Sequence, residues 1–393
     1  MFFIRQAKPN DAGTLLKLAR MVHFINLPAN KEVISEKVRW SDVSFATARG
    51  ASPEDDGTTD LDAGPGAGAA GRSPQFMFVM EETETGNTIG VSSIIASMGA
   101  PGNPNIGMQL RKREFFSKDL QIGATHITAQ LVQDEDGPTE IGSLILGPSY
   151  RGHPAKLGKQ LSLIRFHYMA LHRDQFKDRI LAEMMGPITP DVGNTLWEYF
   201  GRRFINLSYA EADRFCAYSR EFMTALLPRE EIYLTLLPAE ARALIGQVGP
   251  ETLPARIMLE KLGFVYRDRV DPFDGGPHLE AKTDDISIVR DTRHVTLDGS
   301  CPVRDAKRTG LISYEGEGGA GAENEFRAVM TMYAPSRGEA GLKLPASVIK
   351  LLNVKDGARL GLTPMGEPHK PEMVDKRPAK KRTTKKKSRK ASS

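Results

Sequence analysis

The sequence has little cysteine and no long apolar run. Only Cys216 and Cys301 occur among 393 residues, which argues against a disulfide framework or a cysteine-rich zinc site. No stretch of about 18 consecutive apolar residues exists, so we expect no membrane-spanning helix. The apolar start, MFFI, is too short for a signal peptide. These absences favour a soluble protein of the cytoplasm that does not contact a membrane.

Excess positive charge is confined to the C-terminal end. The segment 376–390, KRPAKKRTTKKKSRK, holds ten Lys and Arg residues and no acid. The rest of the chain therefore has a net charge of −6, ten units below the whole-chain value of +4. Because this segment has no apolar face to bury, we expect residues 367–393 to be disordered. Their charge would permit weak, non-specific contact with nucleic acid; a solubilising tail is the alternative.

The remaining composition is that of a folded protein with more than one structural unit. Hydrophobic residues make up 40% of the chain and charged residues 26%, which is usual for a soluble globular protein. Predicted strands and helices alternate irregularly, which indicates an α/β (α+β) sheet with flanking helices. We expect a body over 1–290 with a flexible insertion at 49–75, a Gly-rich linker over 291–324, and a small β module over 325–366.

One stretch, SLILGPSYRGHPAKLGKQLSLIRFHYMALHR at 143–173, predicts a buried strand, a basic loop and a helix. From Leu157 to Leu171, apolar residues recur every three or four positions, as on one face of a helix. Arg, Lys and Gly residues crowd the helix start, where the helix dipole favours negative charge. A bound phosphate would explain this, because free N–H groups at a helix start bind anions. The alternative is a solvated basic turn.

Several segments carry a family resemblance. The loop YRGHPAKLGKQLS resembles the pyrophosphate loop of GNAT acyl-CoA N-acyltransferases. Further segments resemble arginine N-succinyltransferases, in that family's order: LPAN at 27–30, FVMEETETG at 78–86, LAEMMG at 181–186, IGQVGP at 245–250 and LEKLGFVYRDRVDPFDGGP at 259–277. The stretch LKLPASVIKLLNVKDGARLGL at 342–362 resembles that family's C-terminal β module. The chain is thus identified as a member of this family, with a GNAT-like sheet as its expected fold.

The resemblance implies a transferase that moves a succinyl group from succinyl-CoA to the α-amino group of arginine, in arginine breakdown; some members prefer ornithine. Succinyl-CoA would be a co-substrate, with no tightly bound cofactor and no metal, and a homo-oligomer is an expected assembly. The phosphates of CoA need cations and backbone donors. The residues expected to bind CoA are Leu144, Leu146, Arg151, Gly152, Lys156, Gly158 and Lys159, with His153 near phosphate. Core packing is the alternative for the two leucines.

The sequence departs from the family at two places. The family motif GQVHP, whose histidine is the proton donor, reads GQVGP here, with Gly249 at the histidine position. The family's aromatic PWYNYRVG reads PNIGMQLR at 104–111. Glycine cannot transfer a proton. A family member with an altered amine substrate, or one that binds CoA without catalysis, therefore stands as the alternative to arginine succinylation.

Replacement chemistry would require other titratable groups. We expect Glu183 and His278 to be the catalytic residues: Glu183 could bind a cation or accept a proton, and an imidazole titrates at about pH 6.5. We further expect His278 to lie near Gly249 and to fill the role of the absent histidine. The alternatives are a structural carboxylate and an exposed histidine at a strand edge. Asp271 and Asp274 could bind a cationic substrate side chain, or form a solvent-facing turn.

Overall fold

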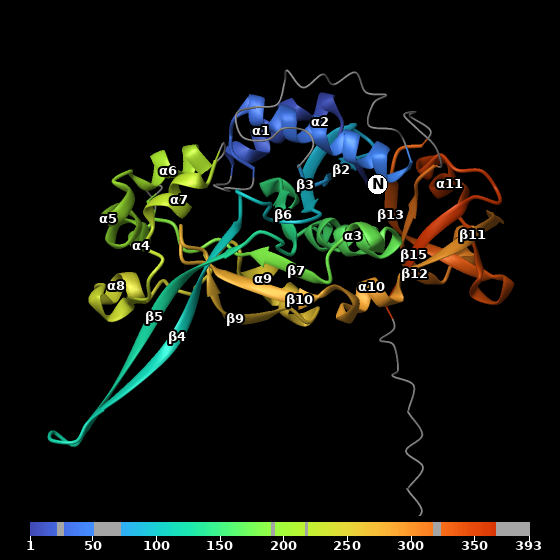
Figure 1. The fold of residues 1–393 in the computed structure, drawn as a ribbon. Coiled ribbons are helices and arrows are strands. Elements are labelled where there is room, and N and C mark those ends of the chain that lie inside the picture. Colours follow the sequence, from blue (N-terminus) through green and yellow to red (C-terminus); the bar gives the residue numbers. More distant parts are fainter. Residues whose placement is uncertain (22–26, 51–71, 190–192, 217–218, 317–323, 367–393) are drawn as a thin grey trace, which may run out of the picture.

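The computed structural model describes residues 1–21, 27–50, 72–189, 193–216, 219–316 and 324–366. Its strands form one continuous sheet in which β13 of a C-terminal barrel pairs with β1 of the N-terminal body (Figure 1). The strands of the body are β1 (Phe2–Gln6), β2 (Gln75–Glu82), β3 (Asn87–Ile95), β4 (Asn105–Ser117), β5 (Ile122–Asp134), β6 (Thr139–Leu146), β7 (Arg179–Glu183), β8 (Ile232–Tyr233), β9 (Val265–Val270) and β10 (Pro277–Lys282).

The body strands lie in the order β1-β2-β3-β6-β7-β10-β9-β4-β5-β8. Every neighbouring pair in this order is antiparallel except β6 and β7. Helices α1 and α2 contact β2 and β3 on one side, and α3 contacts β2, β3 and β6. The helices of the body are α1 (Ala12–Arg20), α2 (Lys31–Ala48), α3 (Leu157–Leu171), α4 (Thr195–Tyr199), α5 (Gly201–Ile205), α6 (Tyr209–Cys216), α7 (Glu221–Leu226), α8 (Ala239–Arg242), α9 (Leu253–Lys261) and α10 (Ser287–Asp291).

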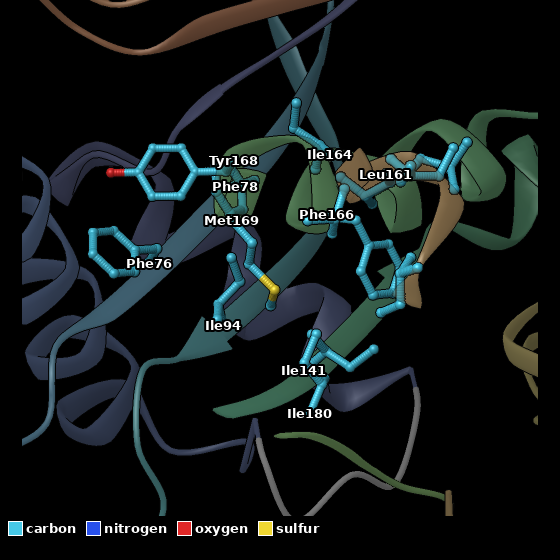
Figure 2. Packing of buried hydrophobic residues seen from close by; sticks show 14 of the residues in the cluster. Phe76, Phe78, Ile94, Ile141, Leu161, Ile164, Phe166, Tyr168, Met169 and Ile180 are labelled. Carbon is cyan, nitrogen blue, oxygen red and sulfur yellow. The ribbon is translucent and has the colours of Figure 1, made fainter. Parts of the chain in front are cut away.

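Helix α3 lies in the largest hydrophobic cluster (Figure 2). Its Phe166, Tyr168 and Met169 are fully buried. The side chains around them come from several strands and include Phe76, Phe78, Ile94, Ile141 and Ile180. The predicted strand, loop and helix over 143–173 are thus confirmed, since β6 ends at Leu146 and α3 begins at Leu157.

The C-terminal unit is a small closed barrel. Its strands pair in a ring, β12-β15-β11-β14-β13 and back to β12, around a buried apolar cluster that includes Leu297, Leu342 and Leu362. The elements are β11 (Arg293–Ser300), β12 (Arg308–Tyr314), β13 (Arg327–Ser336), β14 (Gly341–Leu344), α11 (Ala346–Leu352) and β15 (Arg359–Met365).

The prediction of a linker over 291–324 was wrong, because β11 and β12 lie within it. Its glycines suggested an open chain, but Gly310 lies in β12, where a Cβ would come within 2.7 Å of Leu362 Cδ1 and 3.0 Å of Tyr333 Cε1. Any larger residue there would displace these two side chains, so close packing favours glycine. The expected β module thus begins near 293 rather than at 325. Positions 51–71 of the predicted insertion, and the whole predicted tail 367–393, lie outside the described residues.

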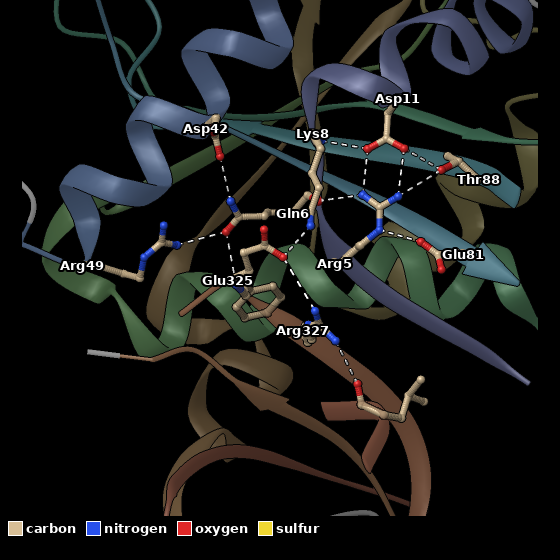
Figure 3. Close-up of polar contacts among 12 residues, drawn as sticks. Arg5, Gln6, Lys8, Asp11, Asp42, Arg49, Glu81, Thr88, Glu325 and Arg327 are labelled. Carbon is tan, nitrogen blue, oxygen red and sulfur yellow. Dashed lines mark hydrogen bonds and ion pairs between the residues drawn. The ribbon is translucent and has the colours of Figure 1, made fainter. Parts of the chain in front are cut away.

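Polar side chains fix β1 between the body and the barrel (Figure 3). Arg5 donates to Glu81 at 2.7 Å and to both carboxylate oxygens of Asp11 at 2.7 and 2.9 Å. The Gln6 side-chain oxygen accepts the backbone N–H of Phe326, which leads into β13, at 3.1 Å. These charge-assisted and buried bonds hold the register of the strand that joins the two units.

A buried histidine connects α3 to the barrel. The His167 ring nitrogens lie 2.6 Å from Thr363 Oγ1 and 2.7 Å from Ser313 Oγ. Burial lowers the pKa of His167 to about 3, so the ring is neutral at physiological pH and donates through one nitrogen while it accepts through the other.

The β4–β5 hairpin extends away from the rest of the molecule (Figure 1). Its distal end carries apolar side chains that are largely exposed, among them Phe116 at 61% and Leu120 at 71%. Such patches are typical of protein–protein contact sites. We expect the hairpin to mediate self-association.

The double substitution Phe116→Asp and Leu120→Asp should lower the sedimentation coefficient toward that of a monomer, because it places charge in the apolar contact. Val303→Asp is the matched control, since Val303 is 70% exposed but lies in the barrel unit. A wild-type protein that sediments as a monomer, or a double variant that sediments like wild type, would contradict this expectation.

Candidate active site

A cavity of about 140 Å³ lies beside the parallel strands β6 and β7. The two strands pair only at Thr139↔Ile180 and Glu140↔Leu181. Beyond these pairs, β6 forms a bulge against β3 at Ser143 and Leu144, and Ser143 has a φ of +50°. A bulge takes an extra residue out of the hydrogen-bonded ladder. Backbone of β6 is thereby presented to the cavity, which Ser143, Leu144 and the β7 residues Ala182 and Glu183 line.

The basic loop follows directly after β6. Gly152 and Lys156 both adopt left-handed conformations, with φ of +74° and +52°, and Lys156 precedes the first residue of α3. No side chain among the described residues caps this helix start, and no acid lies in its first turn. Arg151, Lys156 and Lys159 are exposed. The free N–H groups of the first turn and these cations make the loop suitable for an anion.

Three titratable side chains meet where β7 pairs with β10. Strand β10 pairs with β7 so that His278 lies opposite Glu183, and Asp271 follows β9. One ligand-type atom each from Glu183, Asp271 and His278 lies within 4.8 Å of the other two. We call these three residues the acidic cluster. His278 Nε2 lies 3.9 Å from Glu183 Oε1, which is too long for a direct hydrogen bond.

The acidic cluster is buried and incompletely hydrogen-bonded. Among the described residues, neither ring nitrogen of His278 has a hydrogen-bond partner, and neither does Glu183 Oε1. Burial raises the pKa of Glu183 and of Asp271, and it lowers the pKa of His278 to about 4. Burial, and then the charge of Asp271, raises the pKa of the neighbouring Asp274 to about 8. A neutral imidazole beside carboxyl groups of raised pKa can accept and pass on a proton.

One cation accompanies the cluster. Arg220 Nη1 lies 3.8 Å from Glu183 Oε2. The cluster offers the nitrogen and oxygen ligands that metal ions bind. The positive charge of Arg220 opposes any further cation at the cluster, a metal ion as much as a substrate cation.

Gly249 and His278 both contact the chain near the C-terminal end of β7: His278 pairs with Glu183, the last residue of the strand. The Gly249 N–H donates to the carbonyl of Met185 at 3.1 Å, two residues beyond Glu183. A Cβ at Gly249 would lie 3.5 Å from the Gly186 carbonyl oxygen and 3.6 Å from Thr252 Oγ1, which are ordinary contacts. The position therefore has room for a Cβ atom.

The burial of three side chains rules out two alternatives that the sequence left open. His278 is not an exposed histidine at a strand edge: it is 1% exposed, on a strand paired on both sides. Asp271 and Asp274 do not form a solvent-facing turn; Asp274 accepts the N–H groups of Gly186 and Gly276 at 2.8 and 2.7 Å. Their burial follows from the pairing of β10 with both β7 and β9, a non-local contact.

Other expected site residues have mixed positions. Leu144 lines the cavity, whereas Leu146 is half-buried against the main core cluster. The His153 ring accepts the Ala155 N–H at 3.1 Å and packs edge-on against Phe2, so it supports the loop from within the protein.

Sequence reasoning missed Arg165, Ser143 and Thr252, which line the cavity, and Arg220. For Arg165 a signal was available: it lies among the apolar residues of α3, next to Ile164 and four positions after Leu161. A charged residue within a buried segment is uncommon unless it is paired. No such signal marked Ser143 or Thr252.

Known succinyltransferases resemble this chain in both sequence and fold. The sequence model of the family described as "Arginine N-succinyltransferase beta subunit" matches residues 2–288. The arginine N-succinyltransferase of Enterobacter sp. (strain 638) is 31% identical over 339 residues, 86% of this chain and 90% of that protein. That of Escherichia coli O1:K1 / APEC is 30% identical over 365 residues, 92% of this chain and 97% of that protein.

A solved structure has the same fold. It is described as arginine/ornithine succinyltransferase subunit AI from Pseudomonas aeruginosa, with a TM-score of 0.75 at 24% identity, covering 93% of this chain and 99% of that chain. Sequence and fold together place the protein among the transferases. Within them, the chain belongs to the arginine N-succinyltransferase family. No helix among the described residues is long and apolar enough to cross a membrane.

The two buried histidines should respond oppositely to replacement by leucine. His278→Leu should raise the free energy of unfolding by about 1 kcal/mol, because it removes a buried polar group without partners. His167→Leu is the matched control and should lower it by about 2–4 kcal/mol, because Thr363 and Ser313 lose their partner. Urea denaturation measures both. A His278→Leu variant less stable than wild type by a similar amount would mean that this histidine is a structural residue.

The pH dependence of the unfolding free energy should also show that His278 is buried without a hydrogen-bond partner. The pKa of His278 is about 4 in the folded protein and about 6.5 in an unfolded chain. Between these values the unfolded state binds more protons, so stability from this group falls as the pH drops below about 6.5. His278→Leu should reduce the slope of unfolding free energy against pH near pH 5 by about 1 kcal/mol per pH unit. An unchanged slope would show that His278 titrates normally in the folded state.

Proposed function

We propose that the protein is an acyl-CoA-dependent N-acyltransferase that moves the succinyl group of succinyl-CoA to the α-amino group of arginine. The observation that carries the proposal is the cavity beside β6 and β7, with an uncapped basic helix start after β6 and with Glu183 and Asp271 of the buried acidic cluster in its lining. An anionic carrier suits the first feature and a cationic amine suits the second. The names of the relatives agree with this assignment.

In this proposal the sheet has the GNAT arrangement. The CoA diphosphate binds at the start of α3, near Arg151, Gly152, Lys156, Gly158 and Lys159. A Cβ at Gly158 would make only an ordinary contact, 3.8 Å from Leu146 Cδ2. Packing inside the protein therefore does not require glycine there, whereas a close phosphate would favour it. The thioester lies by Leu144, and succinyl-CoA is a co-substrate rather than a resident cofactor.

The amine nitrogen must lose a proton before it attacks the thioester carbon. The neutral His278 and the Glu183 carboxylate can take that proton, while Asp271 faces the positive charge of the substrate. Attack forms the C–N bond, the C–S bond then breaks, and the leaving thiolate takes a proton. The family assigns that last proton to a histidine whose place Gly249 holds, so here His278, once protonated, or water supplies it.

The ring of His278 lies near the second family departure. A Cβ at Gly107, within 104–111, would lie 3.1 Å from Arg269 Cδ and 3.2 Å from His278 Cε1, so this glycine leaves space for both side chains. A histidine at 278 and a glycine at 107 thus fit each other. We propose a proton-transfer role for His278, which lies on β10, whereas Gly249 lies in the loop before α9.

A cytoplasmic location accords with this proposal, because both cysteines, Cys216 and Cys301, are free. Another candidate is an acyltransferase that its basic tail guides to nucleic acid. In that case, deletion of 376–390 should abolish retention on nucleic acid and leave turnover unchanged.

Release of CoA thiol from succinyl-CoA, measured with arginine, ornithine and other amines, tests the function. We expect release with arginine at a rate limited by thiolate protonation. Gly249→His should raise kcat by about 10- to 100-fold, within the usual range for general acid catalysis. Gly249→Ala is the control, because it fills the same space without a titratable group. Measurable CoA binding without release for any amine would instead assign a binding protein, and release only with another amine would assign an altered substrate.

A further inference from the structure

Arg165 is a buried arginine without an acidic partner. Its residue is 3% exposed, in the middle of α3. Among the described residues, no carboxylate lies within salt-bridge distance of it. Burial lowers its pKa to about 9, so the guanidinium stays charged at neutral pH. An unpaired buried charge is costly, and a protein retains one where a ligand supplies the opposite charge.

The guanidinium is held by Ser162 and also lies over the Phe166 ring, 5.9 Å from the ring centroid. Its Nε donates to the Ser162 carbonyl at 3.1 Å, and its Nη2 donates to Ser162 Oγ at 2.6 Å. A guanidinium has five N–H donors, so these two bonds leave others for a ligand. A planar fork of this kind matches a carboxylate in bidentate geometry.

Arg165 also lines the cavity beside β6 and β7, where it is the only basic residue among the described lining residues. The titratable groups that share the cavity are acids: Glu183, Glu251, Asp271 and Asp274. Arg165 lies eight residues after Leu157, about 12 Å along the helix axis from the basic loop. Arg165 is thus the cationic group on the α3 side of the cavity, at a distance from the phosphate site, and carboxyl groups line the rest of it.

We propose that Arg165 binds the free carboxylate of the succinyl group and so selects dicarboxylic over simple acyl chains. The inference rests on the proposed function and adds the residue that would recognise the acyl donor. A succinyl group differs from a butyryl group of the same length only by its terminal carboxylate in place of a methyl group. A cavity must supply a cation to bury that carboxylate, and Arg165 is the cation it contains.

Two stable thioethers test the proposal without turnover: S-(3-carboxypropyl)-CoA, which mimics succinyl-CoA, and S-butyl-CoA, which lacks the carboxylate. Calorimetry on the wild-type protein should give a Kd for the carboxylated probe about 100-fold lower, as for a buried charge pair. Arg165→Met should bring the two Kd values within about threefold by weakening only the carboxylated probe. Arg165→Lys should give an intermediate ratio, because it keeps the charge and loses the fork.

Arg49→Met is the matched control. Arg49 is also a buried arginine, but it pairs with Glu315 at 3.3 Å and lies away from the cavity lining, so its loss should leave the ratio unchanged. Ser162→Ala is a milder second variant, expected to lower the ratio about tenfold by freeing the guanidinium. Thermal denaturation of each variant verifies that it is folded.

Equal affinity of the wild-type protein for the two probes would overturn the proposal, as would an Arg165→Met variant that weakens both equally. Turnover is a separate matter. If the wild-type protein prefers the carboxylated probe but releases no thiol with any amine, the proposed function fails while the assignment of Arg165 stands. If it releases thiol from succinyl-CoA but shows no preference between the probes, the assignment of Arg165 fails while the proposed function stands.

Discussion

The burial of helix α3 on all sides is the constraint on which the rest of the structure depends. Ten of its fifteen residues are buried, including the unbroken run Ser162–Met169. A helix with one apolar face would need a single neighbouring layer, whereas α3 needs neighbours all around it. Strands β2, β3 and β6 contact it from the body, and α10, β11, β12 and β15 contact it from elsewhere. Body and barrel therefore share one central helix and are not independent units.

Every polar group on a helix buried in this way requires a hydrogen-bond partner or an opposite charge. His167 meets the requirement through the barrel side chains Thr363 and Ser313. Arg165 meets only part of it through Ser162. The start of α3 has no cap among the described residues. Groups left unsatisfied by the fold are where a ligand gains most, and on α3 they lie at its start and at the cavity.

Local patterns made the strand, loop and helix around 147–157 predictable, because the apolar period and the glycines are contained in one short stretch. The barrel was not predictable, since its ring depends on β12 pairing with β13 and β15 across many residues. Helix α2 and strand β4 had no counterpart in the sequence-based expectations. Glu183, Asp271 and His278 could each be named from the sequence. Their meeting could not, because it requires β10 to pair with β7 on one edge and β9 on the other.

The absence of one proton donor should raise the activation barrier by less than the positioning groups of the cavity can lower it. General acid–base help is worth about 10²- to 10⁴-fold, roughly 3–5 kcal/mol. Correct placement of two reactants is worth up to about 7–11 kcal/mol. The groups that would place an anionic acyl donor and a cationic amine, Arg165 on one side and Glu183 with Asp271 on another, are all present and buried. Their charges are opposite, so each substrate is favoured in only one orientation. If succinyl transfer proceeds as proposed, positioning of this kind does not depend on a histidine at position 249, and we expect a slower enzyme of the same specificity.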